Sequence, residues 1–268
     1  MSSKGKVRLT ELLVSRGFFA DAAQAQRAIL AGEVVGANAV LTQPGMLVSP
    51  DIDVRVKAPR RFVSRGGDKL AGALEAFCCD PCGMHCLDVG ASTGGFTHCL
   101  LQQGAASVVA VDVAYGQFAW QLRCDERVTL FERTNIRELN PASATAPFDL
   151  VVCDLSFTSL RSALPALVAF FAPGGYLVAL VKPQFELDSA LVGNGVVTNA
   201  DAHIRALELA IMAAVDNDLA PQNVCFSPIR GQKGNIEFFL YAQQGGIPAT
   251  IDISTVVGQA HERLDLMS

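Results

Sequence analysis

The stretch Asp88-Val-Gly-Ala-Ser-Thr-Gly-Gly95 decides the fold of this 268-residue chain. It follows the apolar run 85–89 and precedes an apolar pattern with helical spacing from Phe96, so it joins a strand to a helix. Glycines at such a junction let the backbone turn tightly against a ligand. Because ligands of open parallel sheets lie beyond the carboxyl ends of the strands, the stretch predicts a ligand site at that edge.

Strand and helix patterns alternate with short connections from Leu70 onward. Strands are expected at 85–89, 107–112, 128–132, 148–154, 175–181, 224–227 and 236–241, and helices at 70–77, 96–103, 117–123, 159–171 and 202–218. This alternation predicts an α/β, Rossmann-like fold with a mostly parallel, seven-stranded sheet covered by helices on both faces.

Residues 1–59 have the pattern of a small, separate α+β domain. Helices are expected at 8–16 and 22–31, the second capped by Asp21, and short strands at 33–36 and 51–56. A proline, paired glycines and clustered cations follow, so we place an interdomain linker at 60–65 and the main domain at 66–268.

Charge is unevenly distributed along the chain: the N-terminal part is basic and the remainder is acidic. Residues 1–70 hold 11 Lys and Arg against 6 Asp and Glu, whereas the remainder holds 10 against 20. Phosphate contacts by the front end would explain this division, and chance segregation is the alternative.

Composition also excludes several classes of protein. No apolar run reaches the length needed to span a bilayer, and the start lacks the apolar core of a signal peptide, so a soluble cytoplasmic protein is expected. The cluster of cysteines between Cys78 and Cys86 lacks a second pair of ligands at a distance, so small buried side chains are expected there and no metal.

The spacing of the glycines restricts the ligand. The pattern is GxxxGG rather than GxGxxG, which disfavours NAD, and no lysine follows as in a P-loop. Asp112 ends the next strand 22 residues after Gly90, where a carboxylate can accept hydrogen bonds from both hydroxyls of a ribose. A glycine turn without a ligand is the alternative.

Taken together, these features resemble the class I methyltransferases, which use S-adenosylmethionine. The resemblance implies that the cofactor's methionine part meets Gly90, Ala91, Ser92 and Gly94 beside Asp88, that its ribose meets Asp112 and Val113, and that Asn135 lies near the adenine.

Four charged residues are expected near this edge: Lys69 at a helix start, Asp154 and Lys182 at strand ends, and Glu237 inside an otherwise apolar strand. Such charges are costly to bury unless they are paired. They suit proton removal from an alcohol before methyl transfer, with Lys182 as the base, Lys69 beside it and both carboxylates orienting the lysines. An ordinary salt-bridge network is the alternative.

Five motifs in order resemble the TlyA family, which joins an S4 RNA-binding domain to an FtsJ-like methyltransferase. They are Ser64-Arg-Gly-Gly-Asp-Lys-Leu70, 88–97, Asp154-Leu-Ser-Phe157, Lys182-Pro-Gln-Phe-Glu186 and the run 227–237. The resemblance implies methylation of cytidine 2′-hydroxyls in ribosomal RNA or a ribosomal subunit. It also implies RNA contacts by Lys4, Lys6, Arg8, Arg16, Arg27, Lys57, Arg60, Arg61 and Arg65.

The chain departs from this family at His98, where an acidic residue is usual, and we assign His98 no role. Because some members carry a haemolysin label, a membrane-active protein is one alternative function, although no stable membrane association is expected. The others are an RNA-binding protein with an inactive methyltransferase domain and an NAD-dependent oxidoreductase.

Overall fold

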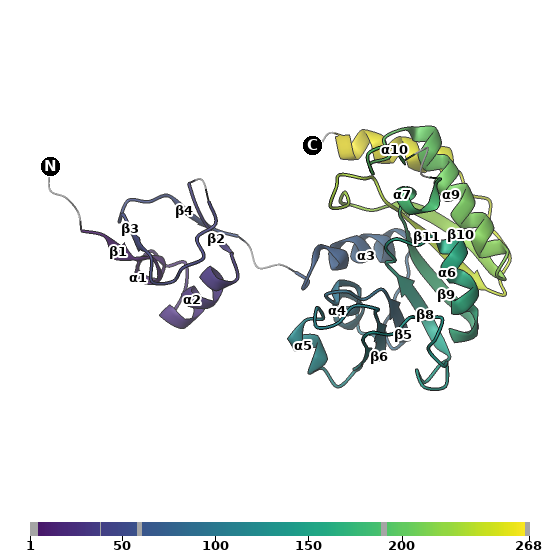
Figure 1. Ribbon diagram of the computed structural model, residues 1–268, viewed down its shortest axis with the longest axis horizontal. Coiled ribbons are helices and arrows are strands. Elements are labelled where there is room, and N and C mark those ends of the chain that lie inside the picture. The colour runs from purple at the N-terminus through teal and green to yellow at the C-terminus, as the bar shows by residue number, and fades with distance from the viewer. Residues whose placement is uncertain (1–4, 38, 58–60, 189–191, 266–268) are drawn as a thin grey trace. The chain divides into compact units, whose positions relative to one another are not determined.

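The computed structural model describes residues 5–37, 39–57, 61–188 and 192–265, and divides into two compact units, Met1–Arg60 and Arg61–Ser268 (Figure 1). In the first unit, helices α1 (Leu9–Ser15) and α2 (Ala22–Leu30) pack through Leu9, Leu13 and Ile29. The Asp21 side chain accepts a hydrogen bond from Gln24 N and caps α2, as predicted.

Two small antiparallel pairs of strands complete the first unit. Strand β2 (Val34–Gly36) pairs with β4 (Val54–Val56), at two places where strands were predicted. Strand β1 (Val7–Arg8) pairs with β3 (Leu47–Val48), and neither of these was predicted because two residues carry no readable alternation.

The second unit is built on a seven-stranded sheet, which confirms the predicted fold class. In spatial order its strands are β10 (Leu219–Phe226), β11 (Phe238–Gln244), β9 (Phe171–Val181), β8 (Phe148–Cys153), β5 (His85–Val89), β6 (Ser107–Val111) and β7 (Val128–Phe131). Strand β11 runs antiparallel to both of its neighbours, and the other neighbouring strands are parallel.

Helices cover both faces of this sheet (Figure 1). One face carries α3 (Arg65–Ala76), α4 (Gly95–Gln102) and α5 (Trp120–Arg123), and the other carries α6 (Leu160–Leu167), α9 (Ala200–Val215) and α10 (Ile253–Asp265). Alternate residues of β8 separate into the two cores, with Leu150 and Val152 on the α3–α4 side and Val151 and Cys153 on the α6–α9 side.

Several predicted boundaries were wrong. Helix α3 begins at Arg65, five residues before the predicted start, so Lys69 lies inside the helix rather than opening it. Burial of Leu70, Ala73 and Leu74 outweighs the poor helix propensity of the paired glycines. Strand β11 begins at Phe238, so Glu237 precedes the strand. Helix α10 and the short helix α7 (Pro183–Glu186) were not predicted.

Candidate active site

The glycine loop after β5 lies directly against the end of β8. Gly90 has a φ of +84°, and a Cβ at this position would collide with the backbone oxygen of Asp154. The amide groups of Gly90 and Ala91 donate to Val111 O over 2.9 and 3.2 Å, and Asp154 N donates to Val89 O over 3.0 Å. Glycine at position 90 therefore lets the predicted cofactor loop and the predicted catalytic Asp154 meet at one edge of the sheet.

Asp112 lies at the same edge, immediately after β6. Its Oδ2 accepts from Ser92 N and its Oδ1 from Ala114 N, both over 2.6 Å. Each carboxylate oxygen has a second lone pair, so Asp112 can still accept hydrogen bonds from a ligand. The neighbouring Val113 is exposed, as is Asn135, whose Oδ1 accepts from Arg137 N beyond β7.

Asp88 is fully buried beneath the loop. Its Oδ2 accepts from the backbone amide and the hydroxyl of Thr97, over 2.9 and 2.6 Å, whereas its Oδ1 has no hydrogen-bond partner among the residues that the structure describes. Burial raises the pKa of Asp88 to about 7, although the bonds from Thr97 oppose this shift. A buried acceptor without a partner is typical of a binding site for a hydrogen-bond donor or a cation.

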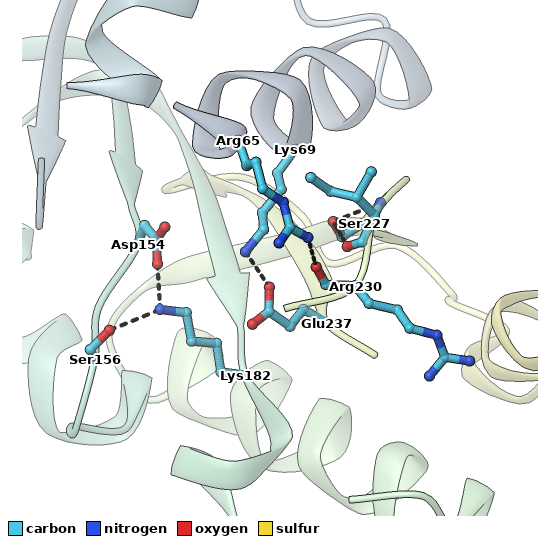
Figure 2. Close-up of polar contacts among 9 residues, drawn as sticks. Arg65, Lys69, Asp154, Ser156, Lys182, Ser227, Arg230 and Glu237 are labelled. Atoms are coloured by element: carbon cyan, nitrogen blue, oxygen red, sulfur yellow. Dashed lines mark hydrogen bonds and ion pairs between the residues drawn. The ribbon is translucent and has the colours of Figure 1, made fainter. Parts of the chain in front are cut away.

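The two predicted lysines are buried and each forms an ion pair with a carboxylate (Figure 2). Lys69 Nζ lies 2.5 Å from Glu237 Oε2, and Lys182 Nζ lies 2.5 Å from Asp154 Oδ1. Lys182 also donates to Ser156 Oγ over 3.0 Å. Both lysines and Glu237 are more than nine-tenths buried, and the opposite charge beside each of them offsets the cost of removing it from water.

Strand pairing brings the two ion pairs to the same place. Phe238 of β11 is opposite Val181 of β9, so the next positions outward along this antiparallel pair are Glu237 and Lys182. Lys69 reaches this edge from α3, and Asp154 follows the end of β8. The four predicted residues therefore come from four different elements and meet beside the glycine loop.

The connection between β10 and β11 holds Glu237 in position. Ser227 N donates to Glu237 O over 2.8 Å, and Ser227 Oγ donates to Ile229 O over 2.7 Å. The Arg65 guanidinium donates to the backbone oxygen of Arg230, which ties the start of α3 to the same connection (Figure 2). The residues that make these contacts lie in two of the motifs quoted above, but the sequence pattern alone does not predict the contacts.

Four further residues around Lys182 were not identified from the sequence: Ser156, Phe157, Phe185 and Glu186. Phe157 is 92% exposed, has a φ of +63°, and its ring centroid lies 5.3 Å from that of Phe185. Glu186 accepts from Leu160 N over 2.9 Å, and burial raises the pKa of Glu186 to about 7. All four lie in the two motifs that follow Asp154 and Lys182, but the sequence alone gave them no individual role.

The cations predicted to contact RNA are exposed wherever the structure describes them: Lys6, Arg8, Arg16, Arg27, Lys57, Arg61 and Arg65. Lys4 and Arg60 lie outside the described residues. Arg16 donates to Pro50 O and Ile52 O over 2.6 and 2.7 Å, and Lys57 donates to Gly32 O over 3.0 Å. These two side chains thus also stabilise the first unit, and the RNA contacts stay a prediction.

Comparison with known proteins places the second unit among methyltransferases. Residues 62–244 match the FtsJ-like methyltransferase family. The chain is 45% identical over 240 residues to the 16S/23S rRNA (cytidine-2′-O)-methyltransferase TlyA of Mycobacterium tuberculosis, covering 88% of this chain and 89% of that protein. It is 42% identical over 273 residues to YqxC of Bacillus subtilis, a candidate rRNA methyltransferase, covering 98% and 97%.

A solved structure resembles the whole chain. It is a candidate hemolysin from Streptococcus thermophilus, 38% identical, with a TM-score of 0.76 and coverage of 98% of both chains. Within the part of the chain that the structure describes, no helix has the length and apolarity needed to cross a membrane.

Proposed function

The chain belongs to the FtsJ-like methyltransferase family, and we propose that it transfers a methyl group from S-adenosylmethionine to the 2′-hydroxyl of a cytidine in ribosomal RNA. The observation that carries this proposal is the meeting of two lysine–carboxylate pairs, whose lysines are both buried, with the glycine loop. The relative from Mycobacterium tuberculosis bears the name of this reaction.

The residues around the loop fit the cofactor. S-adenosylmethionine supplies an electrophilic methyl group and carries positive charge but no phosphate. The unpartnered Oδ1 of Asp88 offers a negative, buried acceptor, and Asp112 at the end of β6 offers acceptors for ribose hydroxyls. In this proposal Gly90, Ala91, Ser92 and Gly94 border the methionine part, Val113 contacts the adenosine, and Asn135 lies near the adenine.

The two lysines would have different roles toward the ribose hydroxyl: one would accept its proton and the other would stabilise negative charge on its oxygen. A ribose hydroxyl becomes a strong nucleophile only as it loses its proton, and an amine accepts a proton only in its neutral form. We assign proton acceptance to Lys182, which Asp154 and Ser156 hold in place. Lys69, held by Glu237, would stabilise negative charge on the attacking oxygen.

The RNA partner and the domain limits belong to the same proposal. We propose residues 1–59 as an S4-like RNA-binding domain, 60–65 as the linker and 66–268 as the methyltransferase domain, acting on ribosomal RNA or a ribosomal subunit in the cytoplasm. The exposed cations of the first unit support phosphate contacts, because such contacts depend on surface charge.

The test is to incubate the purified chain with isotopically labelled S-adenosylmethionine and unmodified ribosomal subunits, and to map ribose methylation in the RNA. We expect label on the 2′-oxygen of a cytidine. Label on a base, or none with either subunit, would contradict the proposal. Vesicle leakage by the same preparation would instead favour the membrane-active role suggested by relatives described as hemolysins.

A further inference from the structure

Residues 61–64, called here the entering segment because they lead into α3, are held against α4 by side chains that the proposed reaction does not use. Val63 N donates to His98 Nδ1 over 3.1 Å, and Gln102 Nε2 donates to Arg61 O over 3.0 Å. Between them the buried ring of Phe62 meets the His98 ring edge-on, with centroids 5.8 Å apart. Two residues one helical turn apart thus hold three consecutive residues of the entering segment.

The same turn of α4 closes the cofactor loop. Helix α4 begins at Gly95, and Thr97, next to His98, makes both hydrogen bonds to Asp88. A Cβ at Gly95 would collide with Ser64 Oγ and lie 2.9 Å from Gly67 N. The entering segment therefore lies against the first turn of α4 with no space between them.

The entering segment also determines the position of Lys69. It continues directly into α3, whose first turn carries Arg65, bonded to Arg230 O, and whose interior carries Lys69, bonded to Glu237. His98 consequently lies between the two halves of the candidate site. On one side is the turn that closes the glycine loop, and on the other is the segment that leads to the lysine–carboxylate pairs.

We propose that His98 is a positioning residue for the methyl transfer: by accepting the hydrogen bond of Val63 N, it holds the segment before α3 on the first turn of α4, so that the cofactor loop and Lys69 take their working positions together. This inference rests on the proposed function. Acceptance at Nδ1 requires the neutral ring with its proton on Nε2, because a proton on Nδ1 would face the Val63 N–H. Nε2 lies 3.0 Å from Gln102 Nε2, and in this tautomer it makes no hydrogen bond with that nitrogen, which donates to Arg61 O. Burial lowers the pKa of His98, which favours the neutral ring.

The experiment compares four variants of the full chain with the wild type. His98→Ala removes the acceptor, whereas His98→Asn places an amide oxygen where Nδ1 stands. Gln102→Ala removes the second hydrogen bond of the clamp from an exposed position, where loss of folding is not expected. His85→Ala is the control, because His85 is an exposed histidine whose Nδ1 also makes a hydrogen bond, at the opposite end of β5.

The readouts are the Kd for S-adenosylhomocysteine by calorimetry, and kcat and KM for S-adenosylmethionine with ribosomal subunits. Loss of one hydrogen bond predicts a rise in Kd and KM of about tenfold in His98→Ala. His98→Asn should restore most of the affinity, Gln102→Ala should weaken it less, and His85→Ala should match the wild type.

The outcomes separate this inference from the proposed function. If His98→Ala lowers the Tm but leaves Kd and KM unchanged, the role is merely structural and the inference is overturned. If His98→Asn binds as weakly as His98→Ala, the acceptor is not the cause, which also overturns it. If the wild type binds no S-adenosylhomocysteine, the proposed function fails and the inference fails with it.

Discussion

Lys69 and Glu237 are 168 positions apart in the chain, yet Lys69 Nζ lies 2.5 Å from Glu237 Oε2 in a buried pair. Removing one partner of such a pair leaves an uncompensated charge, so Glu237→Ala should lower the free energy of unfolding by about 3–5 kcal/mol. Methyl transfer should fall as well, because Lys69 loses its orientation. Urea unfolding and a methyl-transfer assay measure the two effects.

A double variant distinguishes stability from catalysis at this pair. Replacing both partners by apolar residues of similar size, Lys69→Met with Glu237→Leu, removes the unpaired charge and should recover most of the lost stability. Activity should stay low. Recovery of activity together with stability would show that Lys69 has no part in the reaction.

Lys182 is the residue whose replacement tests the assignment of the base. Both Lys182→Met and Lys182→Arg should lower kcat by about a hundredfold or more, because guanidinium keeps the charge but does not give up its proton. Binding of S-adenosylhomocysteine should be retained in both, which calorimetry checks. An active Lys182→Arg variant would assign Lys182 an electrostatic role only.

Asp88 links cofactor binding to stability through its raised pKa of about 7. A carboxyl whose pKa is raised on folding binds its proton more tightly in the folded state. The folded state therefore loses stability as pH rises from the ordinary pKa, 3.8, towards the raised value, and stays less stable above it. Asp88→Asn should flatten this dependence and raise the free energy of unfolding at about pH 8.

The same Asp88→Asn variant should bind the cofactor more weakly. The Asn oxygen can keep both bonds from Thr97, but the amide nitrogen replaces the unpartnered acceptor, and the negative charge is lost. We expect a rise of about tenfold in the Kd for S-adenosylhomocysteine, the size of one charge-assisted hydrogen bond. Equal affinities would remove Asp88 from the cofactor site.

Most of the site residues at the carboxyl edge of the sheet could be predicted from the sequence, because they follow apolar runs. Asp88, Asp112, Asp154 and Lys182 each stand at the end of a strand of a mostly parallel sheet, and such ends meet at one edge. The apolar neighbours of Glu237 predict that it lies inside a strand, whereas the strand begins one residue later. Periodicity locates elements well and their ends poorly.

The rest of the site depends on contacts between elements that no local pattern encodes. Glu186 reaches Leu160 N, and His98 reaches Val63 N, across 26 and 35 positions of the chain. The clamp on Val63 required the close approach that Gly95 permits, which is a property of packing and not of periodicity. The sequence alone therefore indicates no role for His98.

Phe157 is a test of RNA contact beside the lysines. The Phe157 ring is 92% exposed and its backbone is left-handed, so the side chain contributes little to the stability of the fold. Stacking of an unpaired RNA base on such a ring contributes about 1–3 kcal/mol to binding. Phe157→Ala should therefore raise the KM for RNA about tenfold and leave cofactor affinity unchanged. Phe157→Tyr, which keeps the ring, is the matched control and should behave as the wild type.

The histidine pair between α9 and α10 predicts a loss of stability in acid. His203 is fully buried, its Nε2 donates to Val197 O over 3.1 Å, and its Nδ1 lies 2.9 Å from His261 Nε2. Burial, with a smaller contribution from His261, lowers the pKa of His203 from 6.5 to about 4. Because the unfolded chain binds the proton first, folding loses stability as pH falls from 6.5 towards 4.

This loss amounts to about 3 kcal/mol when complete, and urea unfolding at about pH 7 and about pH 5 measures about half of it. His203→Gln keeps an N–H donor for Val197 O but does not titrate, so its free energy of unfolding should change less between the two values of pH. His85→Ala, at an exposed histidine, should keep the dependence of the wild type. If His203→Gln loses as much stability in acid as the wild type, other groups cause the acid sensitivity and the buried histidine does not.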